Sequence, residues 1–205
     1  MSSVTLTGLD ATLDARLRQR LGEHYRGFRG PEYIQALGGT LVARPNPTPS
    51  GIEAFTVHHS AGSHLDTGRD LWAFHRRIGW NTCGYHFVVE YDGEVSMSIP
   101  PVKYISYGAG PAWNDSTVHI CLPGHYHPHQ ELRNGVWRNV SFQPSSEALR
   151  STYVLLCTLD DVVAYRRWPG HRELKATACP GDNLMPHVVE MRRMGAQNPR
   201  PIAYI

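Results

Sequence analysis

The sequence predicts an α/β protein with a mixed central β-sheet flanked by helices. Short apolar runs alternate with segments of helical periodicity along the 205 residues. Two of these runs, residues 85–91 and 94–99, flank Asp92-Gly93, a dipeptide that favours a two-residue hairpin turn. Strands mixed with helices, together with one clear hairpin, indicate an α/β sandwich built around one sheet that contains both kinds of pairing.

The first fifty residues are expected to form an N-terminal extension. Leu13, Leu17 and Leu21 recur at helical spacing within residues 10–22, and Gly22 follows, which predicts a short amphipathic helix. Residues 44–51 carry prolines at every second position, which excludes a helix or a sheet ladder and indicates a linker. The chain therefore divides into an extension of residues 1–50, a main domain of residues 51–196 and an irregular tail of residues 197–205.

The main domain continues with strands and helices in alternation. Thr67 followed by Asp70 resembles a capping box, and it predicts a helix that ends at Gly79. The other expected elements are strands over residues 54–59 and 117–122, a long helix from Ser145 or Ser146 to about Arg167, and a last helix over residues 182–195.

Composition limits the classes of partner. The chain is 41% hydrophobic and 19% charged, which is ordinary for a globular protein, and the net charge of +2 is too small to indicate nucleic acid. The sequence has neither a signal peptide nor an apolar run near 18 residues, so we expect no membrane insertion and synthesis in the cytoplasm. Cys83, Cys121 and Cys157 form no close pair, which argues against a disulfide framework.

Two segments carry the chemistry. Residues 56–61 contain His58 and His59, and residues 170–182 contain His171 and Cys179. Two imidazoles and one thiolate with an open fourth position are the ligands of a catalytic zinc. The alternative for either segment alone is a satisfied core histidine or an inert buried cysteine, because isolated metal motifs are often false.

The two segments flank a third, residues 84–95, which begins Gly-Tyr-His-Phe and ends in a strand and Asp-Gly. In this order, residues 55–184 resemble the zinc-dependent N-acetylmuramoyl-L-alanine amidases of the peptidoglycan-recognition-protein and phage-endolysin type. The resemblance implies the same fold, a Zn²⁺ cofactor, and peptidoglycan, both glycan strand and stem peptide, as the partner. It also implies hydrolysis of the amide between N-acetylmuramic acid and L-alanine, by a lysin that reaches the wall after release.

The resemblance assigns roles residue by residue. It implies that His58, His171 and Cys179 bind zinc, with His59 excluded because adjacent strand residues point to opposite faces and the family motif places the ligand first. Tyr85 matches the tyrosine that stabilises the oxyanion, although a strand tyrosine otherwise packs the sheet. Thr177 lies where relatives carry lysine or threonine, and it can donate a hydrogen bond to the substrate carbonyl.

Asn114, His59 and His86 are expected to bind substrate on the same resemblance. The chain departs from the family in three places. Many members have a histidine near residues 107–110, which is missing here, and His119 replaces a usual glycine.

The third departure is an insertion over residues 125–140. It contains His125, His127 and His129 at alternating positions, which could bind a metal on one face of an extended segment. A solvated loop over the groove is the favoured interpretation, because no carboxylate or cysteine completes the set. Tyr126 and Trp137 could stack on sugar rings or anchor the loop.

Two other functions compete with the amidase. One is a non-catalytic module of the same fold that binds peptidoglycan, and such relatives typically lose the cysteine ligand. The other is a structural zinc, which needs a fourth ligand from His59 or His86. The retained Cys179 and Tyr85 favour the enzyme.

Overall fold

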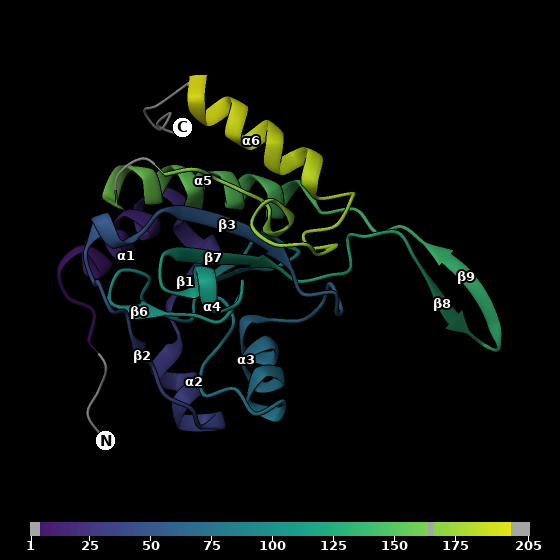
Figure 1. Ribbon diagram of the computed structural model, residues 1–205, viewed down its shortest axis with the longest axis horizontal. Helices are drawn as coiled ribbons and strands as arrows, with labels where there is room; N and C mark the ends of the chain where they lie inside the picture. Colours follow the sequence, from purple (N-terminus) through teal and green to yellow (C-terminus); the bar gives the residue numbers. More distant parts are fainter. Residues whose placement is uncertain (1–4, 164–165, 198–205) are drawn as a thin grey trace.

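A mixed five-stranded sheet forms the centre of the computed structural model, which describes residues 5–163 and 166–197 (Figure 1). The strand order is β1-β5-β4-β7-β3, and only β4 and β5 pair antiparallel. The predicted fold class is therefore confirmed. The five strands are β1 (Tyr25–Phe28), β3 (Ala54–His59), β4 (Phe87–Val89), β5 (Val95–Met97) and β7 (Thr117–Leu122).

Helices cover both faces of the sheet. In Figure 1, α5 (Ser146–Val163) and α6 (Met185–Gln197) lie above β3 and β7, and α2 (Gly30–Leu37) and α3 (Gly68–Arg77) lie below. The first helix, α1 (Gly8–Leu21), contacts α5. Apolar side chains of α1, α5 and the strands fill the main core, and a smaller core between α2 and α3 is centred on Trp72. The remaining short elements are η1 (Gly22–His24), η2 (Pro49–Gly51), α4 (Pro111–Asn114) and η3 (His171–Glu173).

Most predicted elements of the main domain are confirmed. Strands β3 and β7 have the expected bounds, and α3 begins with the expected capping box, in which Thr67 Oγ1 accepts from Asp70 N–H while Asp70 Oδ2 accepts from Thr67 N–H. All four cysteines are free thiols. None of the helices within the described residues is long and apolar enough to cross a membrane.

Two predicted boundaries are wrong. The turn between β4 and β5 was expected to contain two residues but contains three. Glu90 N–H donates to Glu94 O, which makes these two residues the last backbone pair before the turn, and Gly93 N–H donates to Glu90 O within it. Gly93 adopts a φ of 88°. Helix α5 does not reach Arg167. That residue instead forms a parallel bridge with Ala54, and its carbonyl accepts a hydrogen bond from Phe55 N–H, so pairing with β3 replaces the last helical turn.

The first fifty residues contribute directly to the sheet. Strand β1 pairs in parallel with β5, and β2 (Val42–Ala43) pairs with β6 (Tyr104–Ile105). Arg44 is buried beneath the sheet edge and donates to the carbonyls of Pro101 and Asp115. The division of the chain at residue 50 remains a proposal, and these contacts tie the two parts closely together.

The insertion forms a β-hairpin instead of the expected loop over the groove. Strands β8 (His129–Arg133) and β9 (Val136–Val140) pair antiparallel and project away from the body (Figure 1). Asn134 and Gly135 form the turn at φ 51° and 75°, the left-handed conformations of a type I′ hairpin. The hairpin was not predicted, and the Asn-Gly dipeptide is the signal in the sequence that could have indicated it.

Candidate metal centre

The carboxyl end of β3 meets the loop after residue 170 because that segment runs alongside β3. Val57 forms a parallel bridge with Gly170, and its N–H donates to Pro169 O at 2.9 Å. His171 follows this bridge directly and starts η3. The backbone pairing therefore delivers His171 to the end of the strand that carries His58.

The structure brings together His58, His171 and Cys179. Their ligand atoms all lie within 4.8 Å of one another. His58 Nδ1 is 3.7 Å from Cys179 Sγ, and the rings of His58 and His171 are 4.6 Å apart between centroids. Within the described residues, no fourth histidine, cysteine or carboxylate joins this group, so one coordination position stays open.

Burial sets the protonation of the three groups. It lowers the pKa of His58 well below its usual range and that of His171 to about 4, so both imidazoles are neutral and offer a lone pair. It raises the pKa of the Cys179 thiol to about 12 in the metal-free protein. His171 Nε2 is buried and has no hydrogen-bond partner among the described residues, which is costly unless a ligand satisfies it. Two neutral imidazoles, one thiol and an unsatisfied nitrogen fit a zinc ion.

Backbone groups orient Cys179. His59 N–H points at Sγ at 3.3 Å, and Arg172 N–H donates to Cys179 O at 2.8 Å. Cys179 N–H in turn donates to Thr177 Oγ1 at 3.2 Å. Thr177 is exposed, and its hydroxyl hydrogen stays available to a molecule bound outside.

The His59 side chain faces away from the three ligands. Its Nδ1 accepts from Tyr126 N–H at 3.1 Å, and its ring lies 5.5 Å from that of His125. Burial lowers its pKa to about 4. The two rings thus lie on opposite faces of the strand, as expected, with His58 grouped with His171 and Cys179. His59 contributes its N–H to Cys179 Sγ rather than its ring.

Tyr85 lies beside the candidate ligands, two residues before β4 begins. Its ring is 5.5 Å from that of His58 and equally far from that of His75. Burial, with the thiols of Cys121 and Cys179 close by, raises the pKa of Tyr85 well above its usual range, so the phenol keeps its proton. A half-buried phenol beside the candidate ligands can donate a hydrogen bond.

His86 and Asn114, which were expected to bind substrate, make hydrogen bonds inside the protein. His86 is fully buried, with Nδ1 accepting from His119 N–H and from the Ser106 hydroxyl, both at 2.9 Å. Asn114 is 8% exposed, and its Oδ1 accepts from Ala109 N–H at 3.2 Å. Both side chains hold the segment around residues 106–109 in place from inside the protein, and contact with a substrate remains a prediction.

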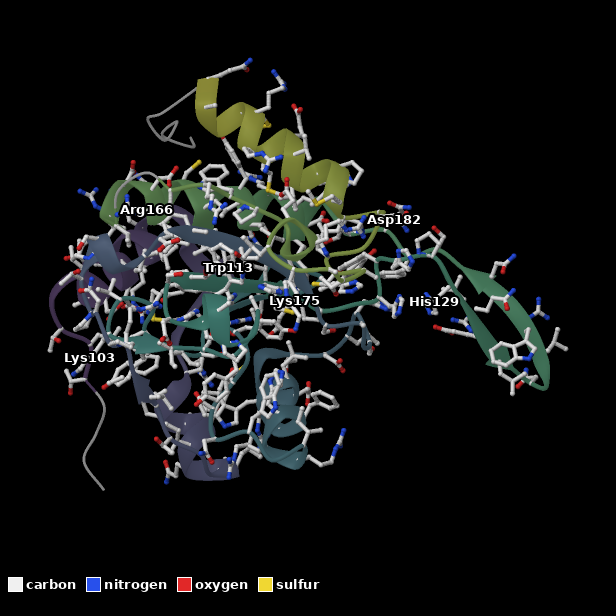
Figure 2. All side chains as sticks on the ribbon, viewed as in Figure 1. Lys103, Trp113, His129, Arg166, Lys175 and Asp182 are labelled. Atoms are coloured by element: carbon white, nitrogen blue, oxygen red, sulfur yellow. The ribbon has the colours of Figure 1, made fainter. Side chains whose placement is uncertain are left out.

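Helix α4, which follows this segment, contacts the loop that carries His171 and Cys179. Trp113 Nε1–H donates to Leu174 O at 3.1 Å, and Arg167 stacks over the indole. Figure 2 labels Trp113 close to Lys175, which is exposed next to this contact. The loop that carries His171 and Cys179 is thus supported on its outer side as well.

His119 is a neighbour of the candidate ligands, and the sequence assigned it no role. Its Nδ1 is 3.0 Å from His58 Nε2, and its side chain is fully buried on β7. The signal in the sequence was the departure itself, a histidine where relatives usually carry glycine.

The insertion histidines gather at the root of the hairpin without forming a three-ligand group. His125 Nδ1 and His129 Nδ1 both lie 2.9 Å from His127 O, and the rings of His125 and His129 are 3.7 Å apart. His129 pairs with Glu131, and His127 with Asp182. No three ligand atoms of this cluster come within 4.8 Å of one another in the described part of the chain.

Comparison with known proteins identifies a family and two kinds of relative. Residues 47–182 match the model of the N-acetylmuramoyl-L-alanine amidase family. The endolysin of Escherichia phage T7 is 27% identical over 135 residues, which cover 64% of this chain and 82% of the phage protein. Peptidoglycan-recognition protein SC1a/b of Drosophila simulans is 25% identical over 170 residues, 77% of each chain.

Solved structures share the fold. The Ph2119 endolysin of a Thermus scotoductus bacteriophage superposes with a TM-score of 0.61 at 20% identity, covering 80% of this chain and 96% of the other. The Drosophila recognition protein PGRP-SD gives 0.56 at 23% identity, covering 72% and 83%. At such identities the likeness concerns the arrangement of the backbone.

Proposed function

This chain belongs to the N-acetylmuramoyl-L-alanine amidase family, and we propose that it is a zinc-dependent hydrolase of peptidoglycan. The bond cleaved joins the lactyl group of N-acetylmuramic acid to L-alanine. The observation that carries the zinc dependence is the convergence of His58, His171 and Cys179, with no fourth ligand among residues 5–163 and 166–197. A closed structural site has four ligands, whereas a catalytic site keeps one position for water or substrate.

Zinc, when bound, supplies a Lewis acid that activates water and polarises the amide carbonyl. The protein supplies the surroundings. Burial keeps both imidazoles neutral, and the N–H of His59 supports negative charge on the Cys179 sulfur. Burial keeps the Cys179 thiol neutral without metal, so this residue would hold zinc as a thiolate and zinc binding would be accompanied by release of its proton.

Tyr85 and Thr177 are proposed to act on the substrate oxygen. Charge develops on the amide oxygen during attack, and preorganised donors at that point lower the barrier. Tyr85 keeps its proton and lies beside His58, while the Thr177 hydroxyl accepts from Cys179 N–H and keeps its own hydrogen for a substrate. Both donors are neutral, so neither adds positive charge at the substrate oxygen.

The second candidate is a module that binds peptidoglycan without cutting it. Peptidoglycan-recognition proteins are among the relatives, so the fold does not separate the two functions. The retained Cys179 and the Tyr85 phenol beside it favour cleavage, because neither thiolate nor phenol is needed to bind a glycan. Like an endolysin, the enzyme would act on the wall after release from the cytoplasm.

Mass spectrometry of digested, purified wall tests the reaction. We expect stem peptides with a free L-alanine amine and intact glycan strands. Elemental analysis should give one zinc per chain, and Cys179→Ala should lose both the metal and turnover. Cys157→Ala, on α5 and half-buried, is the matched control and should retain both. Full lysis by a protein without metal, or products that show cleavage of another bond in the wall, would contradict the proposal.

A further inference from the structure

We infer that His119 is a positioning residue of the metal centre, which holds the His58 imidazole in the tautomer and orientation that zinc requires. The inference rests on the zinc site of the proposed function. His119 touches neither substrate nor metal in this scheme. It acts through His58, which it contacts with one ring nitrogen.

The contact is a hydrogen bond between two buried rings. Strands β3 and β7 run parallel, with Thr56 opposite His119 and His58 opposite Cys121. His58 Nε2 lies 3.0 Å from His119 Nδ1, and the two side chains are 1% and 0% exposed. The other ring nitrogen of His58, Nδ1, lies on the opposite side, toward Cys179 Sγ. One nitrogen thus faces the candidate ligands and the other faces His119.

This geometry links the protons of the two rings. A His58 Nδ1 that binds a cation carries no proton, so the ring hydrogen sits on Nε2 and donates to His119 Nδ1. His119 then carries its own hydrogen on Nε2. In the reverse arrangement His119 donates, the His58 hydrogen sits on Nδ1, and the metal is blocked. A partner on the distal nitrogen of a ligating histidine commonly fixes its tautomer in this way.

His119 is itself held in one place. Its N–H donates to His86 Nδ1 at 2.9 Å, and its carbonyl accepts from His86 N–H at 2.9 Å. The two rings stack at 5.7 Å with an interplanar angle of 23°. On the other side, a Cβ at Gly108 would lie 2.8 Å from His119 Cγ and 2.7 Å from Gly84 O, so only glycine leaves room for the ring there.

Packing alone does not account for a histidine here. His119 Nε2 is buried and has no hydrogen-bond partner among the described residues, so His58 is the one side chain bonded to this ring. A buried polar nitrogen without a partner is costly, and an apolar side chain would avoid that cost. The retained imidazole is explained by its bond to the metal ligand.

Two substitutions separate positioning from space filling. His119→Leu fills the volume and removes the acceptor, whereas His119→Asn places an oxygen where Nδ1 was. Competition with a chelator should show zinc bound about 10–100-fold more weakly by His119→Leu, the usual effect of losing such a partner. His119→Asn should recover most of the affinity. Thr152→Val, a fully buried polar side chain on α5, is the matched control and should bind zinc like the wild type.

A measurement on the wild type makes the test independent of variant folding. In zinc-loaded protein labelled with ¹⁵N-histidine, NMR should place the ring hydrogens of both His58 and His119 on Nε2. A hydrogen on His119 Nδ1, or a folded His119→Leu that binds zinc with wild-type affinity, would overturn the inference and leave the proposed function standing. A wild-type protein that binds no zinc would instead remove the proposed function together with this inference.

Discussion

His58 and His59 are neighbours in the chain, yet their imidazoles lie in different surroundings. Strand β3 has a period of two, so one ring faces His171 and Cys179 and the other faces Tyr126. Burial lowers the pKa of both rings, and only the partners differ. At the scale of single residues, function depends on which side of a strand a side chain occupies.

Tyr85→Phe tests the donor role at the same scale. The variant should keep fold and zinc, because the ring and its contact with His58 remain. Turnover on purified wall should fall by about 10²–10³, the usual cost of one lost oxyanion donor. Steady-state kinetics with zinc analysis of the same samples measures this, and wild-type turnover would show that Tyr85 only packs the sheet.

Helix α1 is joined to the body by a buried carboxylate. Asp10 is 3% exposed, and its two oxygens accept from Val102 N–H at 2.9 Å and Lys103 N–H at 3.1 Å. Burial raises its pKa, and the two backbone donors oppose that shift. Leu13, Leu17 and Leu21 join the main core from the same helix. At the scale of elements, α1 is thus bound by apolar packing, by the Asp10 carboxylate and by the ion pair of Arg20 with Asp161 on α5.

Asp10→Ala should lower the free energy of unfolding by about 1–3 kcal/mol, because two backbone N–H groups lose their acceptor while staying partly buried. Zinc affinity should not change, since Asp10 makes no contact with the metal ligands. Urea unfolding at pH 7 measures the loss, and Glu23→Ala, exposed in η1, serves as the control. Equal stability of the two variants would contradict the anchoring role.

The β8–β9 hairpin exposes large apolar side chains at paired positions of its two strands. Trp137 is 65% exposed and Leu132, its cross-strand partner, 58%. An exposed side chain contributes little to stability, so Trp137→Ala should change the free energy of unfolding by less than about 0.5 kcal/mol. Urea denaturation checks this, and a loss above 1 kcal/mol, on the order of a core effect, would mean that the indole packs against the body.

The whole molecule buries an unusual share of neutral histidine. Burial lowers the pKa of six of the 12 histidines, to about 4 for His75. Unfolded histidine has a pKa of about 6.5. Between these values the unfolded chain binds more protons than the folded one, so acid favours unfolding. Burial also raises the pKa of four carboxyl groups, to about 6 for Asp160 and by a smaller shift for Asp10, Asp66 and Glu90. These groups act in the opposite direction but are fewer than the six histidines.

The stability of the zinc-free protein should therefore be complete above about pH 6.5 and fall steadily toward pH 4. His75→Gln removes one such group at a site that makes no contact with the metal ligands. Its stability should depend less steeply on pH in this window, by up to about 1.4 kcal/mol per pH unit. Urea midpoints at half-unit intervals of pH measure both slopes, and parallel curves would show that His75 is charged in the folded state.

Much of the fold and the candidate site follows from local sequence. The period of two in residues 54–59, the capping box at Thr67 and the apolar face of α5 are properties of neighbouring residues, and the structure retains them. The two ligand segments were also recognisable, because His171 and Cys179 lie within one short loop and His58 ends a strand. The short strands β1, β2 and β6 were not predicted, since pairing with distant strands stabilises them.

Sequence by itself determined the class of fold, because the alternation of strands and helices depends on period and spacing along the chain. It also predicted the two candidate ligand segments, and the preference for His58 over His59 rested on strand alternation together with the family motif. Tertiary structure alone decided where His119 and His86 lie, since their partners are a strand or more away. It also decided where α5 ends, because pairing of Arg167 with β3 competes with a further helical turn. Hydrogen bonds between distant segments produce no periodic pattern in the sequence. The surroundings of the candidate metal centre consist largely of such bonds.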